Sequence, residues 1–208
     1  MGQIILASAS PRRKELLEQI GISFDICPAK GEEIITKSTP QEAVEELAGC
    51  KAREVAGMVK AYETSHRELV TPQDILIIGA DTVVAYDDQI LGKPHDADDA
   101  YRMLSMLAGK THAVYTGVSL VLLGASGRVG ELTFHERTDV VMRAMTEQEI
   151  LRYIQTGEPF DKAGSYAIQG KCAIYIDKIN GDYNNVVGLP VAAIYRELKK
   201  LGIDLYLW

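Results

Sequence analysis

The sequence predicts an α/β protein with a mixed β-sheet. Three observations support this: strand-like apolar runs alternate with helical segments from the first residues, the helical segments carry start and stop signals, and two long strand-like runs are joined by a short turn. Alternation of helices and strands favours parallel pairing, whereas a hairpin joins two antiparallel strands. The combination therefore indicates a sheet whose strands run in both directions.

The first half of the chain is expected to hold strands at 3–7, 24–27, 75–78 and 83–86. Helices are expected at 12–20, from Pro40 towards Val59, and between Asp96 and Gly109. Thr39, Pro40 and Glu42 supply an N-cap, a first-turn proline and a capping-box acid. Gly21 and Gly109 are suited to ending the helices before them. Residues 57–74 lose the apolar periodicity and are expected to form a polar loop, a hinge or an insertion.

The second half of the chain is expected to open with a hairpin, built from 112–123 and 131–143 and joined by a glycine-rich turn. Thr146 with Glu149 predicts another capped helix, which Gly157 ends. A long polar loop follows, then a strand at 172–179 and a last helix at 191–201.

Composition excludes several classes of protein. The 208 residues include 22 Lys and Arg against 29 Asp and Glu, and this net charge of −7 argues against binding nucleic acid through a basic surface. A hydrophobic share of 47% and a charged share of 25% are typical of a globular chain, here one large domain or two small lobes. No apolar run reaches the roughly 18 residues of a membrane span. The start lacks a basic segment before its apolar stretch, so no signal peptide is expected.

The cysteines and histidines do not form a metal-binding pattern. Cys27, Cys50 and Cys172 are odd in number, far apart and never in a C-x-x-C pair, which indicates reduced thiols in the cytosol. The four histidines are equally dispersed. Carboxylates are therefore the plausible metal ligands.

The segment Ser8-Ala9-Ser10-Pro11-Arg12-Arg13 joins the first strand to the first helix. Ser10 suits the N-cap and Pro11 the first helical position. Arg12 and Arg13 then stand in the first turn, where the helix dipole disfavours a cation by about 0.3 to 1 kcal/mol unless an anion lies nearby. An anion site is one interpretation; a solvent-facing pair balanced by nearby glutamates is the other.

Lys51 and Asp81 are each out of place for their surroundings. Lys51 falls inside the apolar stripe of its helix, four residues after Leu47 and four before Val55, so it either extends to the rim or meets a charge. Asp81 stands between two apolar runs, where a carboxylate is costly unless it is hydrogen-bonded, bound to metal or used in proton transfer. A turn-capping role is the alternative for Asp81.

Three further segments are less specific by themselves. Lys93, in a Gly-Lys-Pro turn, presents a cation or is a solvated loop residue. Glu33 follows the second strand and is either a solvated acid or, with Asp81 as its partner, a ligand for a hard cation. The polar segment 158–170 is typical of a binding loop. Its glycine spacing imitates a P-loop, but the spacing is one residue too long and Cys172 stands in place of the Ser or Thr, so a P-loop is excluded.

Together these cations, acids and hydroxyls suggest a site for a polyphosphate with a divalent metal. Five blocks also resemble signature blocks of the Maf proteins, which are nucleoside triphosphate pyrophosphatases. They run in order over nearly the whole chain: SASPRR at 8–13, GADT at 79–82, GKP at 92–94, EPFDKAGSYAIQG at 158–170 and NVVGLP at 185–190.

The resemblance implies a fold and a set of site residues. The fold would be a Maf or inosine-triphosphatase-like domain spanning 1–208, elongated and two-lobed around a central cleft. Asp81 matches the general base, and a second group matches the substrate and metal pocket: Ser8, Arg12, Arg13, Glu33, Lys51 and Lys93. Arg12, Thr82 and Gln169 match positions that separate family subgroups, and they resemble the dTTP/UTP subgroup.

The implied reaction converts a nucleoside triphosphate and water into a monophosphate and pyrophosphate. We expect Mg²⁺ or Mn²⁺ held by Glu33 and Asp81, a cytoplasmic homodimer, and no nucleic-acid or membrane partner. Two other functions remain open: a non-catalytic nucleotide sensor in cell-division control, and a phosphatase for small sugar phosphates.

Overall fold

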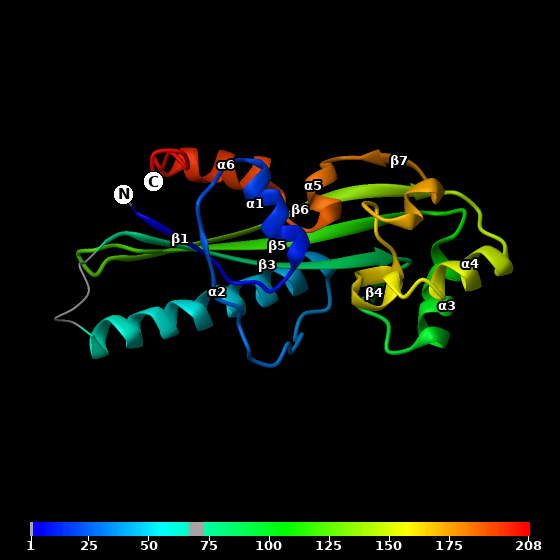
Figure 1. The fold of residues 1–208 in the computed structure, drawn as a ribbon, viewed down its shortest axis with the longest axis horizontal. Helices are drawn as coiled ribbons and strands as arrows, with labels where there is room; N and C mark the ends of the chain where they lie inside the picture. Colours follow the sequence, from blue (N-terminus) through cyan, green and yellow to red (C-terminus); the bar gives the residue numbers. More distant parts are fainter. Residues whose placement is uncertain (1, 67–72) are drawn as a thin grey trace. The chain divides into compact units, whose positions relative to one another are not determined.

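The structure is a computed structural model that describes residues 2–66 and 73–208. Its described strands form one seven-stranded sheet in the order β2-β1-β3-β5-β6-β7, with β4 paired to β3 (Figure 1). β1 pairs parallel with β2 and β3, whereas β4 is antiparallel to β3 and β7 is antiparallel to β6. The predicted mixed α/β sheet is therefore confirmed. The strands are β1 (Gln3–Leu6), β2 (Asp25–Ile26), β3 (Ile75–Tyr86), β4 (Gln89–Leu91), β5 (Thr111–Leu123), β6 (Val129–Met142) and β7 (Ile176–Asn180).

Four helices begin at the predicted capping residues Ser10, Thr39, Asp96 and Thr146, although the Ser10 side chain makes no capping hydrogen bond. Thr39 Oγ1 accepts a hydrogen bond from the Glu42 amide, and Thr146 and Glu149 form a complete capping box. Gly21, Gly109 and Gly157 all have positive φ after a helix, as their predicted role requires. None of the helices formed by the described residues is both long and apolar enough to cross a bilayer. The helices are α1 (Pro11–Gln19), α2 (Pro40–Ser65), α3 (Ala97–Leu107), α4 (Glu147–Ile154), α5 (Tyr183–Val187) and α6 (Val191–Lys200).

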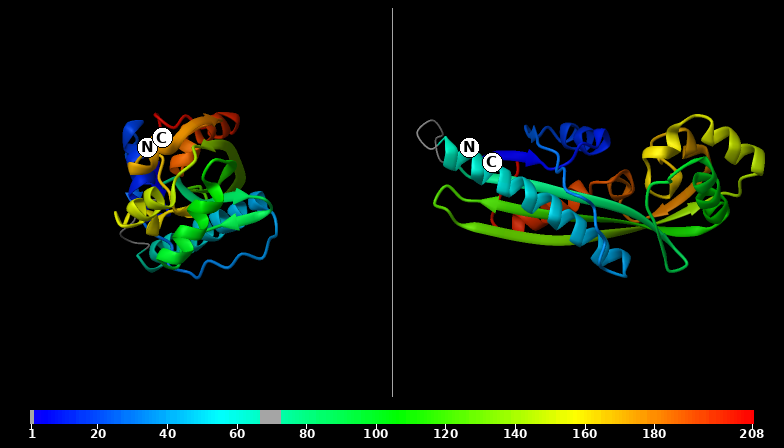
Figure 2. Two further views of the ribbon diagram at one scale, coloured as in Figure 1. Left: turned by 90° about the vertical axis from the view of Figure 1, so that its right-hand side faces the viewer. Right: turned by 90° about the horizontal axis from the view of Figure 1, so that it is seen from below.

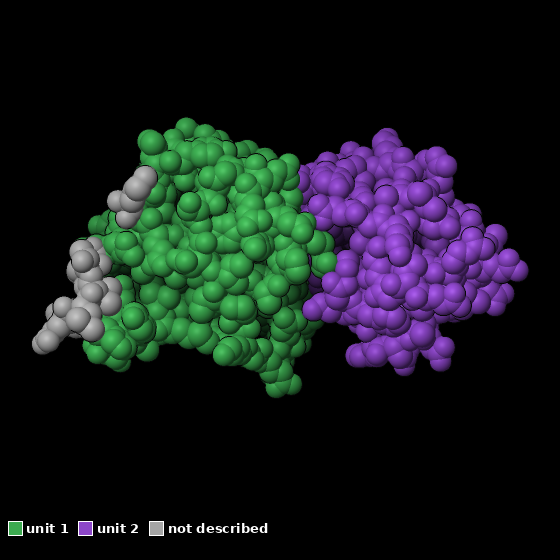
Figure 3. Space-filling view, in the orientation of Figure 1, with its two compact units in different colours: residues 1–81, 117–135, 188–208 green, residues 82–116, 136–187 purple. Residues whose placement is uncertain are grey.

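The chain divides into two compact units, coloured separately in Figure 3. The first unit contains residues 1–81, 117–135 and 188–208, and the second contains 82–116 and 136–187. β3, β5 and β6 each contribute to both units. The prediction of a single Maf-like domain with a cleft between two lobes stays a prediction.

In the first unit, α2 packs on one face of the sheet and α1 and α6 lie on the other (Figures 1 and 2). Ala52 and Val55 of α2 share a buried cluster with Ile5, Ile75 and Ile77. The helix approaches the sheet closely because Gly79 and Gly117 lie beneath it. A Cβ on Gly79 would lie 2.5 Å from the carbonyl oxygen of Ala48, and one on Gly117 would lie 2.2 Å from that of Val44.

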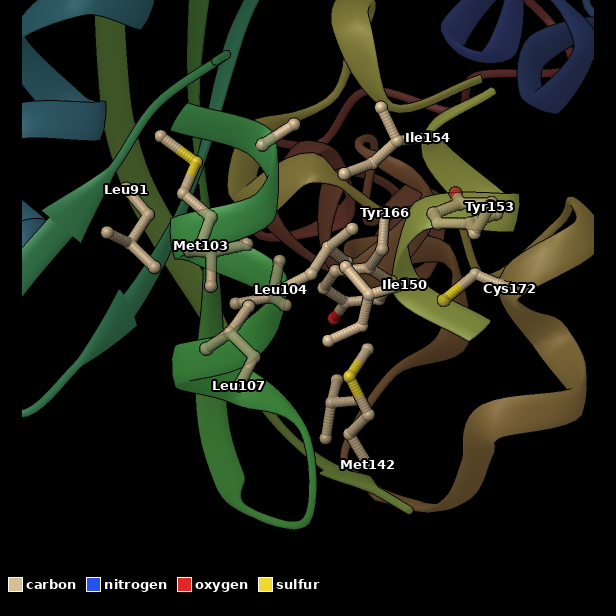
Figure 4. Close-up of a cluster of buried hydrophobic side chains, with 14 residues drawn as sticks. Leu91, Met103, Leu104, Leu107, Met142, Ile150, Tyr153, Ile154, Tyr166 and Cys172 are labelled. Carbon is tan, nitrogen blue, oxygen red and sulfur yellow. The ribbon is translucent and has the colours of Figure 1, made fainter. Parts of the chain in front are cut away.

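The second unit has a core of its own, shown in Figure 4. α3 contributes Leu104 and Leu107, and α4 contributes Ile150 and Tyr153. The thiol of Cys172 is fully buried in this cluster, and burial raises its pKa to about 12. This cysteine is therefore a protonated core residue at neutral pH.

Two predictions of secondary structure were wrong in extent. α2 continues to Ser65, so 57–65 is helix rather than polar loop; Ala56 and Val59 still pack on the core of the first unit, and this contact extends the helix past Gly57. Residues 67–72 of that predicted loop lie outside the described residues. β3 is continuous over twelve residues, which puts Asp81 within a strand rather than at its end.

The region after α4 also differs from expectation. The polar segment 158–170 holds two short 3₁₀ helices, Glu158–Asp161 and Ala163–Ser165, and a third covers Lys171–Tyr175. β7 therefore begins at Ile176, not at residue 172. Cys172 packs into the core of the second unit from the third 3₁₀ helix, and this packing accounts for the helical turn at the start of the run that was predicted to be a strand.

Candidate active site

Lys51 of α2 lies between two carboxylates. Its Nζ is 2.5 Å from Asp81 Oδ1 and 2.7 Å from Glu33 Oε1. The side chains of Lys51 and Asp81 are only 16% and 11% exposed, whereas that of Glu33 is 55% exposed. Of the two interpretations of Lys51, the structure supports the one in which it meets charge.

Strand periodicity explains why Asp81 faces α2. Side chains alternate between the two faces of a strand, and Ile75 and Ile77 of β3 pack in the cluster that contains Ala52 and Val55 of α2. Asp81 is in phase with these two isoleucines. The close approach of α2 over Gly79 then brings Lys51, three residues after Ala48, to the carboxylate.

The turn between β1 and α1 positions Arg13. Arg13 is 9% exposed, and its guanidinium donates from Nε to the Gly188 carbonyl over 2.8 Å and from Nη1 to Ser8 Oγ over 3.1 Å. Ser8 Oγ also accepts the Ser10 amide at 3.2 Å. Burial lowers the pKa of the Arg13 guanidinium below its ordinary value, and the negative charge of Asp81 opposes this shift. An arginine side chain stays charged in proteins, so Arg13 remains a buried cation.

Arg12, Glu33 and Asp81 all act electrostatically on Arg13. The first unit thus gathers three cationic side chains, Arg12, Arg13 and Lys51, with two anionic ones. This arrangement leaves net positive charge beside the serine hydroxyl of Ser8, which suits a phosphate group.

The two carboxylates also fit a divalent cation. Oxygens of Glu33 and Asp81 converge on one positive atom, the ammonium nitrogen of Lys51. Across the part of the chain that the structure describes, no group of three or more His, Cys, Asp or Glu side chains is placed to bind a metal. Mg²⁺ is commonly held by one or two carboxylates together with substrate phosphates, and this donor set suits that mode.

Thr82, Lys93 and Gln169 belong to the second unit. Thr82 Oγ1 lies 2.9 Å from Thr116 Oγ1, whereas Lys93 and Gln169 are exposed on loops. A hydrogen bond from the Gly164 amide to the Gly92 carbonyl, 3.0 Å long, joins the turn of Lys93 to the segment that carries Gln169. The roles of these three residues stay predictions.

The segment of Gln169 is anchored by a buried tyrosine and a carboxylate. Tyr153 Oη donates to Glu158 Oε1 over 2.7 Å and accepts from the Ala167 amide at 3.2 Å. Glu158 Oε2 accepts the Lys171 amide at 3.0 Å. Gln169 therefore lies between two fixed points, Ala167 and Lys171.

Sequence reasoning missed two kinds of contact. The Gly188 carbonyl accepts a hydrogen bond from Arg13, but any residue type has a backbone carbonyl, so the sequence does not reveal this contact. The one signal at this position is the glycine itself, which suits the φ of 124° found there. The second kind involves Glu46 and Glu54 of α2, which contact the segment around Glu33. In the sequence, both have the pattern of ordinary solvated residues on a helix surface.

The chain is similar to several proteins that share one name. A dTTP/UTP pyrophosphatase of Agathobacter rectalis is 67% identical over 98% of this chain and 100% of its own length. Proteins of the same name from Lachnoclostridium phytofermentans and Bacillus cereus are 49% and 47% identical, each over 98% of its own length and over 99% and 98% of this chain. A solved nucleoside-triphosphatase / dITP/XTP pyrophosphatase from Mycobacterium abscessus aligns with 68% of this chain and 74% of its own, at 17% identity and a TM-score of 0.35, which is too low to bear on function.

The family model described as "Maf-like protein" matches residues 3–201, which is nearly the whole chain and includes the five sequence blocks described above. With this match and relatives at this level of identity, the chain belongs to the Maf-like protein family.

Proposed function

We propose that this chain is a nucleoside triphosphate pyrophosphatase that acts on dTTP and UTP, or on modified pyrimidine nucleotides, and so removes them from the nucleotide pool. The observation that carries the proposal is the placement of Lys51 between Asp81 and Glu33, within the electrostatic reach of Arg13. The names of the relatives support the substrate class.

The charges of the first unit suit a triphosphate. Such a substrate carries about four negative charges, and phosphoryl transfer depends mainly on positioning and charge neutralisation. Arg12, Arg13 and Lys51 supply fixed positive charge, and Ser8 supplies a hydroxyl donor. Lys93 would add a fourth cation from its turn.

Asp81 is proposed as the general base. It orients a water molecule and accepts its proton while the water oxygen bonds to the α-phosphorus and the bond from that phosphorus to the bridging oxygen breaks. Pyrophosphate leaves with the electron pair of that bond. Lys51 fixes the carboxylate that receives the proton.

Glu33 and Asp81 would hold Mg²⁺ or Mn²⁺. The bound ion would neutralise charge on the phosphates.

Gln169 has an amide that offers both a donor and an acceptor, as the edge of uracil or thymine requires, and we assign base recognition to it together with Arg12 and Thr82. We further propose a cytoplasmic homodimer that binds neither nucleic acid nor membrane; sedimentation of the purified chain tests the oligomeric state.

The test is a panel of natural and modified triphosphates supplied with Mg²⁺ or Mn²⁺ and scored for pyrophosphate release. Reaction in ¹⁸O-water adds the site of attack, because attack at the α-phosphorus puts the label in the monophosphate. We expect labelled UMP and dTMP with unlabelled pyrophosphate. Release of orthophosphate without pyrophosphate would indicate a phosphatase instead, and nucleotide binding without turnover would indicate a sensor.

A further inference from the structure

Glu33 lies on a segment that has no regular secondary structure to hold it. Between β2 and α2 the described residues 27–39 form neither helix nor strand (Figure 1). All of residues 30–39 are exposed. Ordering such a chain costs roughly 1 to 2 kcal/mol per residue. The Glu33 side chain is 55% exposed, and ion pairs at the surface typically contribute about 0 to 1 kcal/mol. The contact with Lys51 is therefore too weak by itself to order the segment.

Glu54 of α2 binds the beginning of this segment. Its Oε1 accepts the Lys30 amide at 2.8 Å, and its Oε2 accepts the Gly31 amide at 3.0 Å. Both hydrogen bonds run from a backbone amide to a charged carboxylate, and such charge-assisted bonds are stronger than bonds between neutral groups. A Cβ on Gly31 would lie 2.8 Å from Glu54 Oε2, so the amides reach the carboxylate across a position that has no side chain.

Glu46 of α2 binds the other end of the segment. Its Oε2 accepts the Thr36 amide at 2.8 Å and its Oε1 accepts the Thr36 hydroxyl at 2.5 Å. These two hydrogen bonds lower the pKa of the Glu46 carboxyl below its ordinary value. The segment is thus bound on both sides of Glu33 by the helix that also carries Lys51.

We infer that Glu46 and Glu54 are positioning residues that act through Glu33. They hold the segment so that the Glu33 carboxylate stays directed at Lys51 and is ready to bind the divalent cation. This inference rests on the proposed function, in which Glu33 is a metal ligand. Residues that position a metal ligand typically influence metal affinity by about 10- to 100-fold.

The first measurement is amide hydrogen exchange in peptides covering 28–39, without nucleotide or metal. We expect the Lys30, Gly31 and Thr36 amides to exchange roughly 10-fold faster in Glu46→Gln/Glu54→Gln than in the unmodified chain. Gly31→Ala displaces the Glu54 carboxylate without altering any charge, and it should speed exchange at residues 30 and 31 alone. Glu63→Gln on the same helix is the matched control and should change nothing.

The second measurement is the Mg²⁺ concentration that gives half-maximal pyrophosphate release. The double variant should raise it about 10-fold, with kcat at saturating Mg²⁺ and the thermal midpoint close to those of the unmodified chain. In a Glu33→Gln background the same two substitutions should have no further effect, because the residue through which they act is already lost. A purely structural role would lower the thermal midpoint and would persist in that background.

Three results would overturn the inference: unchanged exchange at 28–39 in the double variant, faster exchange with an unchanged Mg²⁺ requirement, or an equal loss with and without Glu33. Failure of the proposed function would be recognised separately. In that case the unmodified chain would release no pyrophosphate, while the exchange experiment would still report on the two glutamates.

Discussion

Lys51 lies on the apolar side of α2, where a lysine side chain normally extends towards solvent. Its ammonium instead meets Asp81 and Glu33, and the pair with Asp81 is largely buried. Buried ion pairs gain little net stability over well-packed apolar residues, because desolvation offsets their attraction. Keeping such a pair therefore favours a role in chemistry over a role in stability.

Replacement of Asp81 by asparagine tests that role. The amide keeps the shape of the side chain but cannot accept a proton, so we expect kcat to fall by more than about 100-fold. Steady-state pyrophosphate release measures the effect, and circular dichroism checks the fold. Asp88→Asn is the matched control: it lies in an exposed turn with φ of 62°, a conformation asparagine tolerates, and should leave kcat unchanged. Near-normal turnover in Asp81→Asn would rule out Asp81 as the base.

At the scale of elements, the site depends on how closely α2 approaches β3. Gly79 is the position that allows this approach, because a Cβ there would lie 2.5 Å from the Ala48 carbonyl oxygen and 2.9 Å from the Ala52 amide nitrogen. Both are backbone atoms of the helix, so they cannot give way by rotating a side chain. Lys51 is held by the same turn of α2.

Gly79→Ala should therefore both destabilise the protein and lower its activity. Overpacking of this kind costs about 1 to 3 kcal/mol, measurable by urea unfolding, and displacement of α2 should reduce kcat/KM. Gly57→Ala is the control on the same helix, where an added Cβ meets nothing within 4 Å. It should raise stability by up to about 1 kcal/mol. Equal behaviour of the two variants would contradict the role assigned to Gly79.

The segment of Gln169 depends on Tyr153 of α4. Tyr153→Phe removes the hydroxyl that joins Glu158 to the Ala167 amide and leaves that largely buried donor without its acceptor. The expected loss of stability is about 1 to 3 kcal/mol. Urea unfolding measures it, with Tyr183→Phe as the control because Tyr183 is 43% exposed. A loss no larger than in the control would show that the hydroxyl does not anchor the segment.

At the scale of the whole molecule, stability should depend on pH through a buried histidine. His112 is 3% exposed, its Nε2 lies 2.7 Å from Tyr166 Oη, and its Nδ1 is buried with no hydrogen-bond partner among the described residues. Burial lowers the pKa of His112 from 6.5 to about 4. The buried site disfavours the charged ring, which is the cause of this shift.

The sign of the effect follows from this depressed pKa. The contribution of His112 is full above pH 6.5 and is lost as pH falls towards 4, because the unfolded chain binds the proton first. The loss should amount to about 3 kcal/mol, measured by urea unfolding between pH 7 and pH 4. His112→Gln should flatten that part of the curve, whereas the exposed His95→Gln should not. Parallel curves for His112→Gln and the unmodified chain would refute this assignment.

Much of this molecule follows from local rules. The helix starts at Thr39, Asp96 and Thr146 and the mixed sheet were predictable because capping and periodicity depend on residues near one another in sequence. Lys51 and Asp81 could be singled out for a related reason, since each conflicts with its own element. That conflict is visible without knowing the partner.

The partners themselves were decided by tertiary structure. Partly exposed helix glutamates such as Glu46 and Glu54 satisfy every local rule, so their contacts with residues 30–36 leave no mark in the sequence. Gly188, whose carbonyl binds Arg13, lies 175 residues after it in the sequence. The residue types, and the places where helices and strands begin, follow from the sequence alone, because they depend on short-range sterics and hydrogen bonding. Which side chains meet depends on the packing of α2 and α1 against the sheet, and only the folded chain sets that distance.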